Sequence, residues 1–569
     1  MNITKPYKAA TPEETTAHIK EILSKSGLPV KEVILGDDRM FFSCRISFTD
    51  DDDTSIGTNG KGMNRSYAMA SGYAEFMERL QNRVIVYPNP MATVTPCRFF
   101  PDETEYRWTS RKEIEDNIKA FTPSTFPEEG IKADRMEGKS LPFYHVNTGK
   151  VENIPYSLIR WVNGSNGMSA GNILEESLIQ GFCEIFERHA LQKMYLDNIV
   201  PPDIPLKVFE GTVIQERLVR MKAEYGMDFG IKDLSLGEGF PVLGLLVYSP
   251  DKTKYILQLG ADLNPVTALE RCFTEIFQGY TANTLCFEND VNHCERVDLF
   301  NEFKRSLTYG RGRLPKSFFS DSPSYSYKGH TTITVGRNFR EDLNNICRWI
   351  TAKGYDIYLR DNSFLGFKTT HIVVPRLSDI DKTFCRLNRR IHHMTLIENR
   401  KNPLFNLRAI DSDECKATAE YLETLDTPTV DLFPRSHNRN NHVNRLLLLL
   451  LLYIKAGDKK QAILTGERYL HDCTARHKEP MSMIKALLQQ LGGDTGEVIP
   501  ARLSSVAAQL LQQPDMIFNA IPVPDCFNCT DCPISEGCRF PLVKRIEDFV
   551  QKAMAEYDFN QNIFSTILT

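Results

Sequence analysis

Residues 169–191, SAGNILEESLIQGFCEIFERHAL, predict a helix that carries a polar stripe on an apolar body. An α-helix turns once every ~3.6 residues, so positions separated by four, four and three residues return to the same face. That face presents Glu176, Gln180, Glu184 and Glu187. Apolar side chains cover much of the remaining surface, namely Leu178, Ile179, Phe182, Ile185 and Phe186. A helix this apolar has neighbours on several sides, so the three carboxylates need an explanation beyond exposure to water.

The same polar spacing recurs in two further segments that also predict helices. A polar residue is followed after four positions by Glu, and after three more by Glu or Gln. The residues are Ser71, Glu75 and Glu78, with Arg79 next, in 66–81; Gln180, Glu184 and Glu187, with Arg188 next, in 169–191; and Arg271, Glu275 and Gln278 in 261–280. In each segment they are set among Phe, Tyr, Met, Ile and Leu.

Two interpretations of the stripes stay open. For one helix alone, a solvated acidic face is the simpler interpretation. For three helices together we favour a shared pocket, because lysine is scarce on these faces and few i,i+4 pairs would neutralise the acids. Carboxylates crowded together repel one another and are costly to bury without cations. Mg²⁺ prefers oxygen ligands, often one or two carboxylates plus phosphate oxygens, so the stripes predict Mg²⁺ ions bound together with a polyphosphate.

Glycine-containing segments precede two of the stripes. SNGMSAGN, residues 165–172, has small side chains that would let backbone N–H groups and Asn172 approach an anion at the N-terminus of a helix. GTNGKG, residues 57–62, lacks the GxxxxGK[ST] spacing of a Walker A loop. We expect the second segment to be a turn, which is the commonest role of such glycines.

These motifs resemble the YcaO family of ATP-dependent enzymes that activate peptide backbone amides. The resemblance rests on TNGKG followed by S-x3-E-x2-ER, on SNGMSAGN with E-x7-E-x2-ER, and on ALER-x3-E-x2-Q, with a later match over residues 355–380. It is closest to a bacterial branch with a helical C-terminal extension. The resemblance implies that residues 1–400 form a YcaO-type domain that binds ATP and Mg²⁺.

The resemblance also implies which residues form the site. The implied nucleotide-binding residues are Lys8, Thr15, Ser71, Glu75, Glu78, Asn172, Glu176, Gln180, Glu184, Glu187, Arg188, Arg271 and Glu275. Within this set Glu75, Glu78, Glu184 and Glu187 would bind metal, and Glu187, Arg188 and Arg271 would take part in catalysis. Gln278 would hold these residues in position without touching the ligand itself. Lys8 and Thr15 match over little sequence, so a purely structural role for them stays open.

The family chemistry transfers the γ-phosphoryl group of ATP to an amide oxygen, which turns that oxygen into a good leaving group. Protein residues mainly position the reactants and neutralise charge. The nucleophile that follows is a neighbouring Cys, Ser or Thr, an external sulfide or an amine. Azoline-forming members commonly end in a Pro-rich C-terminus, whereas this chain ends NIFSTILT, with no proline after Pro541. That difference argues against heterocycle formation and leaves thioamidation, another amide activation or an accessory role open.

Local patterns predict an α/β or α+β first domain. Strands are expected at 41–48, 241–250, 254–263 and 370–375, with a hairpin joining the second and third. A helix is expected at 342–354, with Gly354 just beyond its end. Residues 401–515 predict an all-α, tetratricopeptide-like domain that caps the first domain or binds a partner. Residues 516–569 would form a Cys-rich segment with a terminal helix.

The Cys-rich segment contains CFNCTDCPISEGC, with Cys526, Cys529, Cys532 and Cys538. Structural zinc usually takes two C-x2-C pairs separated by a longer loop. A C-x2-C-x2-C run with a nearby fourth Cys is more typical of an iron–sulfur cluster. We therefore expect a metal site, iron–sulfur before zinc, with a disulfide pair as the alternative.

Composition narrows the classes of partner. The chain has 569 residues, 41% hydrophobic and 25% charged, with a net charge of −5, which gives no electrostatic reason to expect nucleic acid or an anionic membrane as partner. The segment MNITKPYKAATPEE has no apolar h-region, so we expect no signal peptide. The longest apolar run, 446–454, is far shorter than the ~20 residues of a membrane span. Ten of the fourteen cysteines are scattered and indicate reduced thiols in the cytoplasm.

Three functions therefore stay under consideration. The first is an ATP-dependent enzyme acting on a peptide or protein amide, with a sulfur-delivery protein as one expected partner. The second is a nucleotide-binding accessory factor for a radical methylthiotransferase that modifies a ribosomal protein, a role implied by the family resemblance. The third is a redox partner that works through the cysteine cluster. A homodimer is compatible with all three.

Overall fold

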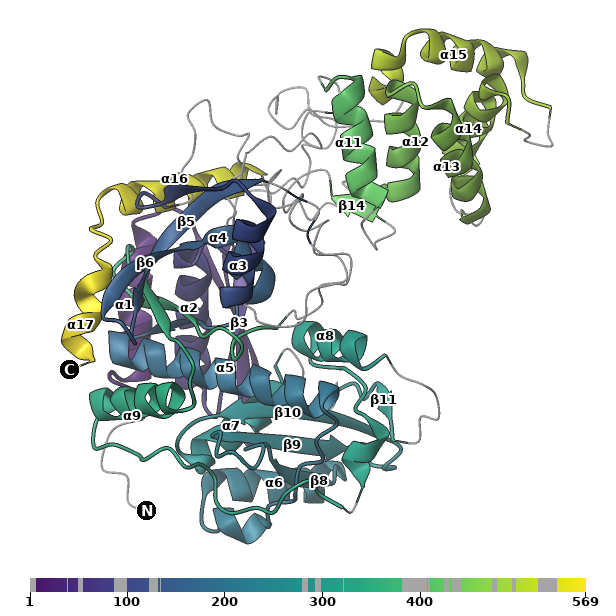
Figure 1. Ribbon diagram of the computed structural model, residues 1–569. Helices are drawn as coiled ribbons and strands as arrows, with labels where there is room; N and C mark the ends of the chain where they lie inside the picture. The colour runs from purple at the N-terminus through teal and green to yellow at the C-terminus, as the bar shows by residue number, and fades with distance from the viewer. Residues whose placement is uncertain are drawn as a thin grey trace.

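The computed structural model describes residues 7–568 apart from 38, 50–54, 86–99, 122–130, 132, 134, 279–284, 292–297, 321, 381–406, 408–409, 424–428, 432–441, 473–477, 494–497 and 520–539. Its first part, up to β13, is a mixed α/β structure with three antiparallel sheets (Figure 1). No helix in these ranges has both the length and the apolar character needed to cross a membrane.

The first sheet has the order β1-β2-β3, from Val30–Asp37, Phe41–Thr49 and Ser55–Gly62. The second has the order β11-β10-β9-β8, from Asn289–Asp290, Lys254–Ala261, Val242–Tyr248 and Phe229–Asp233. The third has the order β4-β5-β12-β13-β7, and its strands are Thr104–Trp108, Met136–His145, Tyr358–Asp361, Lys368–Val373 and Met168–Gly171 in that order. A sixth strand, β6 (Lys150–Pro155), pairs with β5. The four expected strands are confirmed as β2, β9, β10 and β13, and β9 and β10 form the expected antiparallel hairpin.

The helices of this part are α1 (Pro12–Ser24), α2 (Arg65–Gln81), α3 (Arg111–Phe121), α4 (Tyr156–Val162), α5 (Leu174–Leu196), α6 (Val213–Tyr225), α7 (Pro265–Ile276), α8 (Leu299–Tyr309) and α9 (Phe339–Ala352), with short 3-10 turns η1 (Leu206–Phe209) and η2 (Lys316–Phe319). The helix expected at 342–354 is confirmed as α9. Gly354 follows it with a φ of +80°, a left-handed conformation that glycine adopts without strain.

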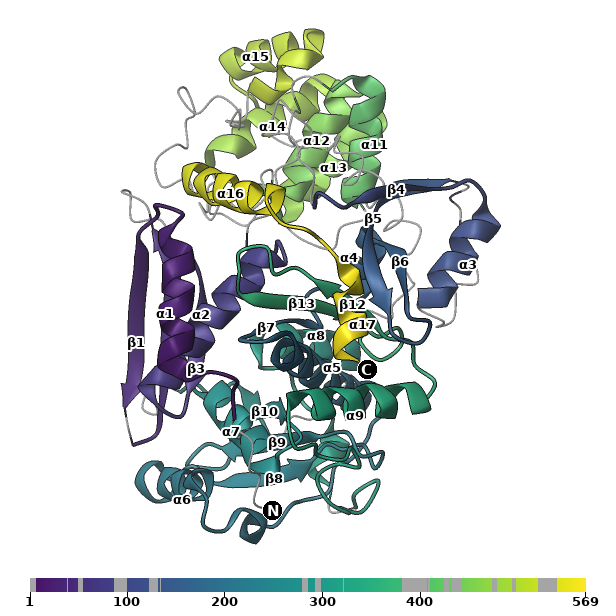
Figure 2. The same cartoon turned by 90° about the vertical axis from the view of Figure 1, so that its left-hand side faces the viewer.

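Helix α5 is central to the fold. It packs against β7 and β13 of the third sheet and against β10 of the second, and Figure 2 shows it between them. Phe182, Phe186 and Tyr195 are fully buried along its length. Because these faces are occupied by apolar packing, the polar stripe is left to face α2 and α7.

Both glycine-containing segments are more regular than expected. The prediction of a turn at 57–62 is wrong, because these residues belong to strand β3. A Cβ at Gly60 would lie 2.2 Å from Gly72 N and 2.4 Å from Ala68 O, so glycine here lets β3 lie directly against α2. In the second segment Met168–Gly171 form strand β7, and α5 begins only at Leu174.

A largely helical region follows the first part. It contains α11 (Ser412–Glu423), α12 (Arg445–Lys455), α13 (Lys459–Asp472), α14 (Lys478–Leu491), α15 (Ala501–Gln512) and the 3-10 turn η5 (Pro514–Asn519) around a hydrophobic core of their own. The expectation of an all-α region is wrong in one detail. Strands β14 (Thr429–Asp431) and β15 (His442–Asn444) form a short antiparallel pair, and Asn444 then caps α12.

The last helices return to the first part of the chain. They are α16 (Phe540–Ala555), the 3-10 turn η6 (Gln561–Ile563) and α17 (Phe564–Ile567). Leu542, Ile546, Val550 and Met554 of α16 share a hydrophobic core with α1, α2 and β2. Figure 2 shows α16 and α17 in yellow along the body formed by the earlier strands. The chain therefore leaves the α/β part, forms the helical region and comes back.

Candidate functional site

The three polar stripes meet. Glu75 and Glu78 come from α2, Glu184 and Glu187 from α5, and Arg271 and Glu275 from α7. Each of these side chains is half-buried. The charge of Glu184 acts on both Glu75 and Glu78, and the charge of Arg271 acts on Glu187. The structure thus brings acids from three separate stretches of sequence into one cluster, which we call the carboxylate cluster: Glu75, Glu78, Glu184, Glu187 and Glu275.

Cations from the protein itself neutralise much of this cluster. Arg79 lies 3.6 Å from Glu75 and 3.5 Å from Glu78, and Arg188 lies 2.7 Å from Glu184. The expectation that few i,i+4 pairs would neutralise the acids is therefore wrong, because two arginines pair with carboxylates of their own helices. Outside these helices, the ammonium of Lys61 on β3 pairs with Glu275.

Even so, the cluster holds carboxylates with raised pKa values. Burial, assisted by the charges of Glu184 and Glu75, raises the pKa of Glu78 to about 8. Burial, assisted by Glu184, raises the pKa of Glu187 to about 7. Perturbed carboxyls that face one another from different elements are typical of sites that bind a ligand or a metal.

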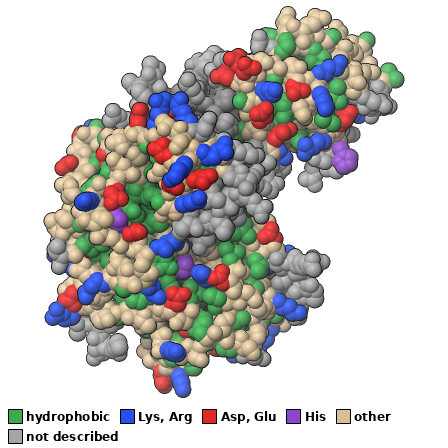
Figure 3. Space-filling view, viewed as in Figure 1, with side chains coloured by type: hydrophobic (Ala, Val, Ile, Leu, Met, Phe, Trp, Pro, Cys, Tyr) green, Lys and Arg blue, Asp and Glu red, His purple; other side chains and the backbone are tan. Residues whose placement is uncertain are grey.

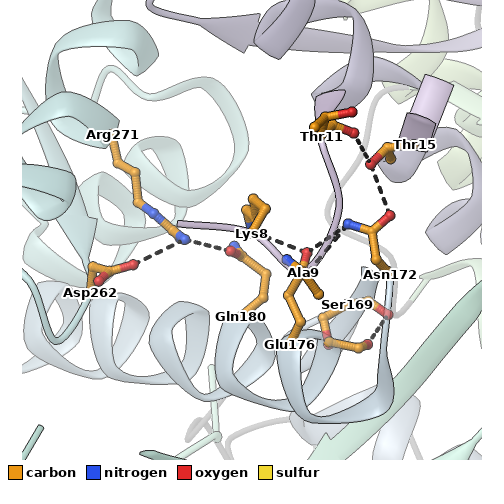
Figure 4. Close-up of polar contacts among 11 residues, drawn as sticks. Lys8, Ala9, Thr11, Thr15, Ser169, Asn172, Glu176, Gln180, Asp262 and Arg271 are labelled. Carbon is orange, nitrogen blue, oxygen red and sulfur yellow. Dashed lines mark hydrogen bonds and ion pairs between the residues drawn. The ribbon is translucent and has the colours of Figure 1, made fainter. Parts of the chain in front are cut away.

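A second group of contacts surrounds the N-terminal turn of α5 (Figure 4). The backbone N–H of Ala9 donates to Glu176 at 2.9 Å, and the Lys8 ammonium lies 3.5 Å from the same carboxylate. The hydroxyl of Thr15 donates to Asn172 Oδ1 at 2.8 Å, and the Asn172 amide donates to Glu176 at 3.3 Å. Four residues implied by the family resemblance, Lys8, Thr15, Asn172 and Glu176, thus form one connected network.

Arg271 is held between two acceptors. Its terminal nitrogen donates to Gln180 Oε1 at 2.6 Å and lies 3.4 Å from Asp262 (Figure 4). Asp262 is itself fixed, because its other carboxylate oxygen accepts the backbone N–H of Asn264 at 2.9 Å. The buried Nε of Arg271 has no hydrogen-bond partner among the described residues. A fixed guanidinium with an unused donor beside a carboxylate cluster is suited to bind an anion.

Two further expected residues lie at the edge of the cluster. Ser71 Oγ accepts the backbone N–H of Lys61 at 3.5 Å, a long contact that joins α2 to β3. Gln278 lies just beyond the end of α7 and donates to the backbone oxygen of Asn59 at 3.4 Å. Both link the strand that carries Lys61 to a helix of the site.

Reasoning from the sequence missed two members of the site, Lys61 and Asp262. Lys61 lies within the TNGKG motif. A turn, which was expected there, does not define the direction of the Lys61 side chain, whereas strand β3 does. Asp262 lies between β10 and α7 in the stretch ADLNP, close to Arg271 in sequence, yet no periodic pattern marks it. The only indication in the sequence was that Asp262 and Arg271 have opposite charges and lie nine positions apart.

The donor set fits Mg²⁺ held together with a phosphorylated ligand. Within the described ranges, no three His, Cys, Asp or Glu side chains are gathered as a ready coordination sphere, since the carboxylates are turned to Arg79, Arg188 and Lys61. Mg²⁺ commonly takes one or two carboxylates and completes its octahedron with phosphate oxygens and water. The proposed metal ligands Cys526, Cys529, Cys532 and Cys538 lie outside the described residues.

Known proteins are similar to this chain over about two thirds of its length. The ribosomal protein S12 methylthiotransferase accessory factor YcaO of Escherichia coli is 26% identical over 397 residues, which span 66% of each protein. A solved heterocyclase in complex with substrate and cofactor is 16% identical with a TM-score of 0.48 and covers 70% of this chain and 57% of its own. YcaO from Methanopyrus kandleri bound with AMPPCP and Mg²⁺ is 16% identical with a TM-score of 0.40 and covers 66% of this chain and 93% of its own.

The family assignment itself rests on a sequence profile. Residues 59–378, more than half of the chain, match the family described as YcaO cyclodehydratase, ATP- and Mg²⁺-binding. The match includes α2, α5 and α7 with the whole carboxylate cluster. This chain therefore belongs to the YcaO family.

Proposed function

We propose that this protein uses Mg²⁺ and ATP to phosphorylate a backbone amide of a peptide or protein, so that a nucleophile can then modify that amide. The observation that carries the proposal is the meeting of carboxylates from α2, α5 and α7 beside Arg271, whose Nε has no partner among the described residues. Acids and an anion-binding group side by side suit a metal–polyphosphate ligand better than either does alone.

The side chains divide into three tasks. Glu75, Glu78, Glu184 and Glu187 supply oxygen ligands for Mg²⁺, which would neutralise the phosphates when bound. Arg188 and Arg271 stabilise the negative charge that spreads over the transferring phosphoryl group. The network of Lys8, Thr15, Asn172 and Glu176 offers hydrogen bonds to the rest of the nucleotide.

In this reaction the amide oxygen forms a bond to the γ-phosphorus and the bond to the leaving oxygen of ADP breaks. The added nucleophile then expels phosphate, which carries the original amide oxygen with it.

A second candidate function is supported by the similarity to the Escherichia coli protein, which is named as an accessory factor. Here the chain would bind nucleotide and assist a radical methylthiotransferase, with its tetratricopeptide-like helical region as the docking surface. That region has a hydrophobic core of its own, which suits a separate binding module.

The division into domains at 1–400, 401–515 and 516–569 is part of the proposal, with one refinement. Because α16 shares a core with α1 and α2, we place residues 540–568 with the first domain. The helical region is then an insertion in the YcaO-type domain rather than an extension.

Transfer of an oxygen label separates the two functions. Ribosomal protein S12 labelled with ¹⁸O at its backbone amides is incubated with the protein, ATP and Mg²⁺, and the released phosphate is analysed by mass spectrometry. Amide activation predicts ¹⁸O in the phosphate when S12 or another tested peptide is the substrate. Tight ATP binding with S12 capture but unlabelled phosphate would instead support the accessory function.

A further inference from the structure

Lys61 differs from Arg79 and Arg188 in the element from which it reaches the carboxylates. Arg79 and Arg188 pair with carboxylates on their own helices. Lys61 reaches the cluster from strand β3, and its ammonium pairs with Glu275 on α7. Its charge interacts with Glu187, Glu75 and Glu184 as well, so one ammonium serves acids of three helices.

The strand holds Lys61 firmly. Gly60 and Gly62 on either side have no room for a Cβ against α2, since that atom would lie 2.2 Å from Gly72 N and 2.5 Å from Ala68 N respectively. Successive side chains of a strand point to opposite faces, so the side chain of Lys61 leaves β3 away from α2 and toward α7. Backbone packing therefore fixes the point at which the Lys61 side chain enters the cluster, while its ammonium stays free to change partners.

Such a position is costly for an ammonium unless carboxylates surround it. Burial lowers the pKa of Lys61, and the nearby glutamates oppose that effect. An ammonium is a compact point charge on a flexible stem, so it can move from one anion to another without losing bonding geometry.

On the basis of the function proposed above, we propose that Lys61 is the resident cation of the carboxylate cluster in the nucleotide-free protein and that Mg²⁺–ATP displaces its ammonium onto a phosphate oxygen. Mg²⁺ alone would have to displace Lys61 without offering it a new anion. Mg²⁺ together with ATP supplies both the replacement charge and the new partner. Lys61 thereby makes metal binding depend on nucleotide.

Binding of Mn²⁺ without nucleotide, followed by electron paramagnetic resonance, tests the inference. Lys61→Met should bind Mn²⁺ about tenfold or more tightly than the wild type, because the cluster loses its competing cation. Lys61→Arg should keep weak binding. Lys232→Met is the matched control, since Lys232 is also half-buried and pairs with Asp203 at 2.9 Å, on another sheet.

An unchanged Mn²⁺ affinity in folded Lys61→Met would overturn the inference. Lys61→Gln, which keeps a polar end, serves as the second neutral variant if Lys61→Met fails to fold, and the same tightening is expected of it. Calorimetry of Mg²⁺–ATP with the wild type separates the two levels of the proposal. If the wild type binds Mg²⁺–ATP but neither neutral variant binds Mn²⁺ more tightly, the role of Lys61 is wrong and the proposed function stands. If the wild type does not bind Mg²⁺–ATP, the proposed function itself is wrong.

Discussion

Arg83 and Glu547, 464 residues apart in the chain, form a bidentate ion pair with N–O distances of 2.9 and 2.6 Å. Arg83 is fully buried and lies just beyond the C-terminal end of α2, with a φ of +58°. Glu547 lies on α16. The pair therefore fastens the returning C-terminal helix to the helix that carries Glu75 and Glu78.

We expect Glu547→Ala to lower the free energy of unfolding by about 3–5 kcal/mol, because it removes the carboxylate that accepts from both terminal nitrogens of the buried Arg83 guanidinium. Urea unfolding measures the loss. The exposed pair of Lys112 and Asp116 is the control, and Asp116→Ala there should change nothing measurable. Equal effects of the two substitutions would contradict the structural importance of the Arg83 pair.

Substitution of Glu187 by Gln should weaken binding of Mg²⁺–ATP while the fold is retained, because one metal ligand of the cluster is lost. Glu175→Gln is the control: Glu175 lies on the same helix but faces Arg340 at 3.3 Å, away from the cluster. Isothermal calorimetry gives both affinities. Equal ATP affinity in the wild type and in Glu187→Gln would remove Glu187 from the site.

The stability of the nucleotide-free protein should fall as pH rises from about 5 to 8. The folded protein holds the proton of Glu78 up to a pKa of about 8, whereas the ordinary value is 4.5. The folded state thus binds more protons than the unfolded chain across this window, so the free energy of unfolding decreases with pH. Glu78→Gln cannot ionise, so its melting temperature should exceed that of the wild type at pH 9 and match it at pH 5. A constant difference at both pH values would show that the effect is steric.

Asp262→Asn should selectively weaken binding of a triphosphate. The substitution keeps the shape but removes the charge that helps Gln180 to hold Arg271. We expect the affinity for a non-hydrolysable ATP analogue with Mg²⁺ to fall about fivefold, near 1 kcal/mol, with AMP affinity unchanged. Asp262→Glu should restore part of the loss. A parallel loss of AMP affinity would indicate a general structural defect instead.

Metal analysis tests the cysteine cluster, which lies outside the described residues. Protein purified anaerobically should contain about four irons per chain if Cys526, Cys529, Cys532 and Cys538 bind an iron–sulfur cluster, or about one zinc otherwise. Cys529→Ser should lose the metal and keep ATP binding, since α16 is fastened independently by Glu547. Metal-free wild-type protein would refute the site.

Part of this structure followed from local pattern. The period of about 3.6 residues in 169–191 placed Glu176, Gln180, Glu184 and Glu187 on one face of α5. The short apolar segments 241–250 and 254–263 predicted β9 and β10. These features depend on residues within one or two turns of each other, so sequence spacing contains the necessary information.

Other features depend on contacts between distant segments. GTNGKG favours a turn by composition, yet it pairs with β2 as a strand. Gly60 and Gly62 are needed there because α2 approaches too closely for a side chain at either position. The FPLVKRIEDF stretch predicted a helix, but only packing against α1 and α2 placed it as α16 on the first domain.

The site divides in the same way. The sequence by itself determined which acids lie together on each helix, because that depends on the geometry of a single helix. The tertiary structure decided that three helices bring those acids into one cluster and that Lys61 enters it from β3. The interaction between two charges depends on their distance in space. Which cation neutralises an acid is therefore determined by the tertiary structure and not by their separation in the sequence.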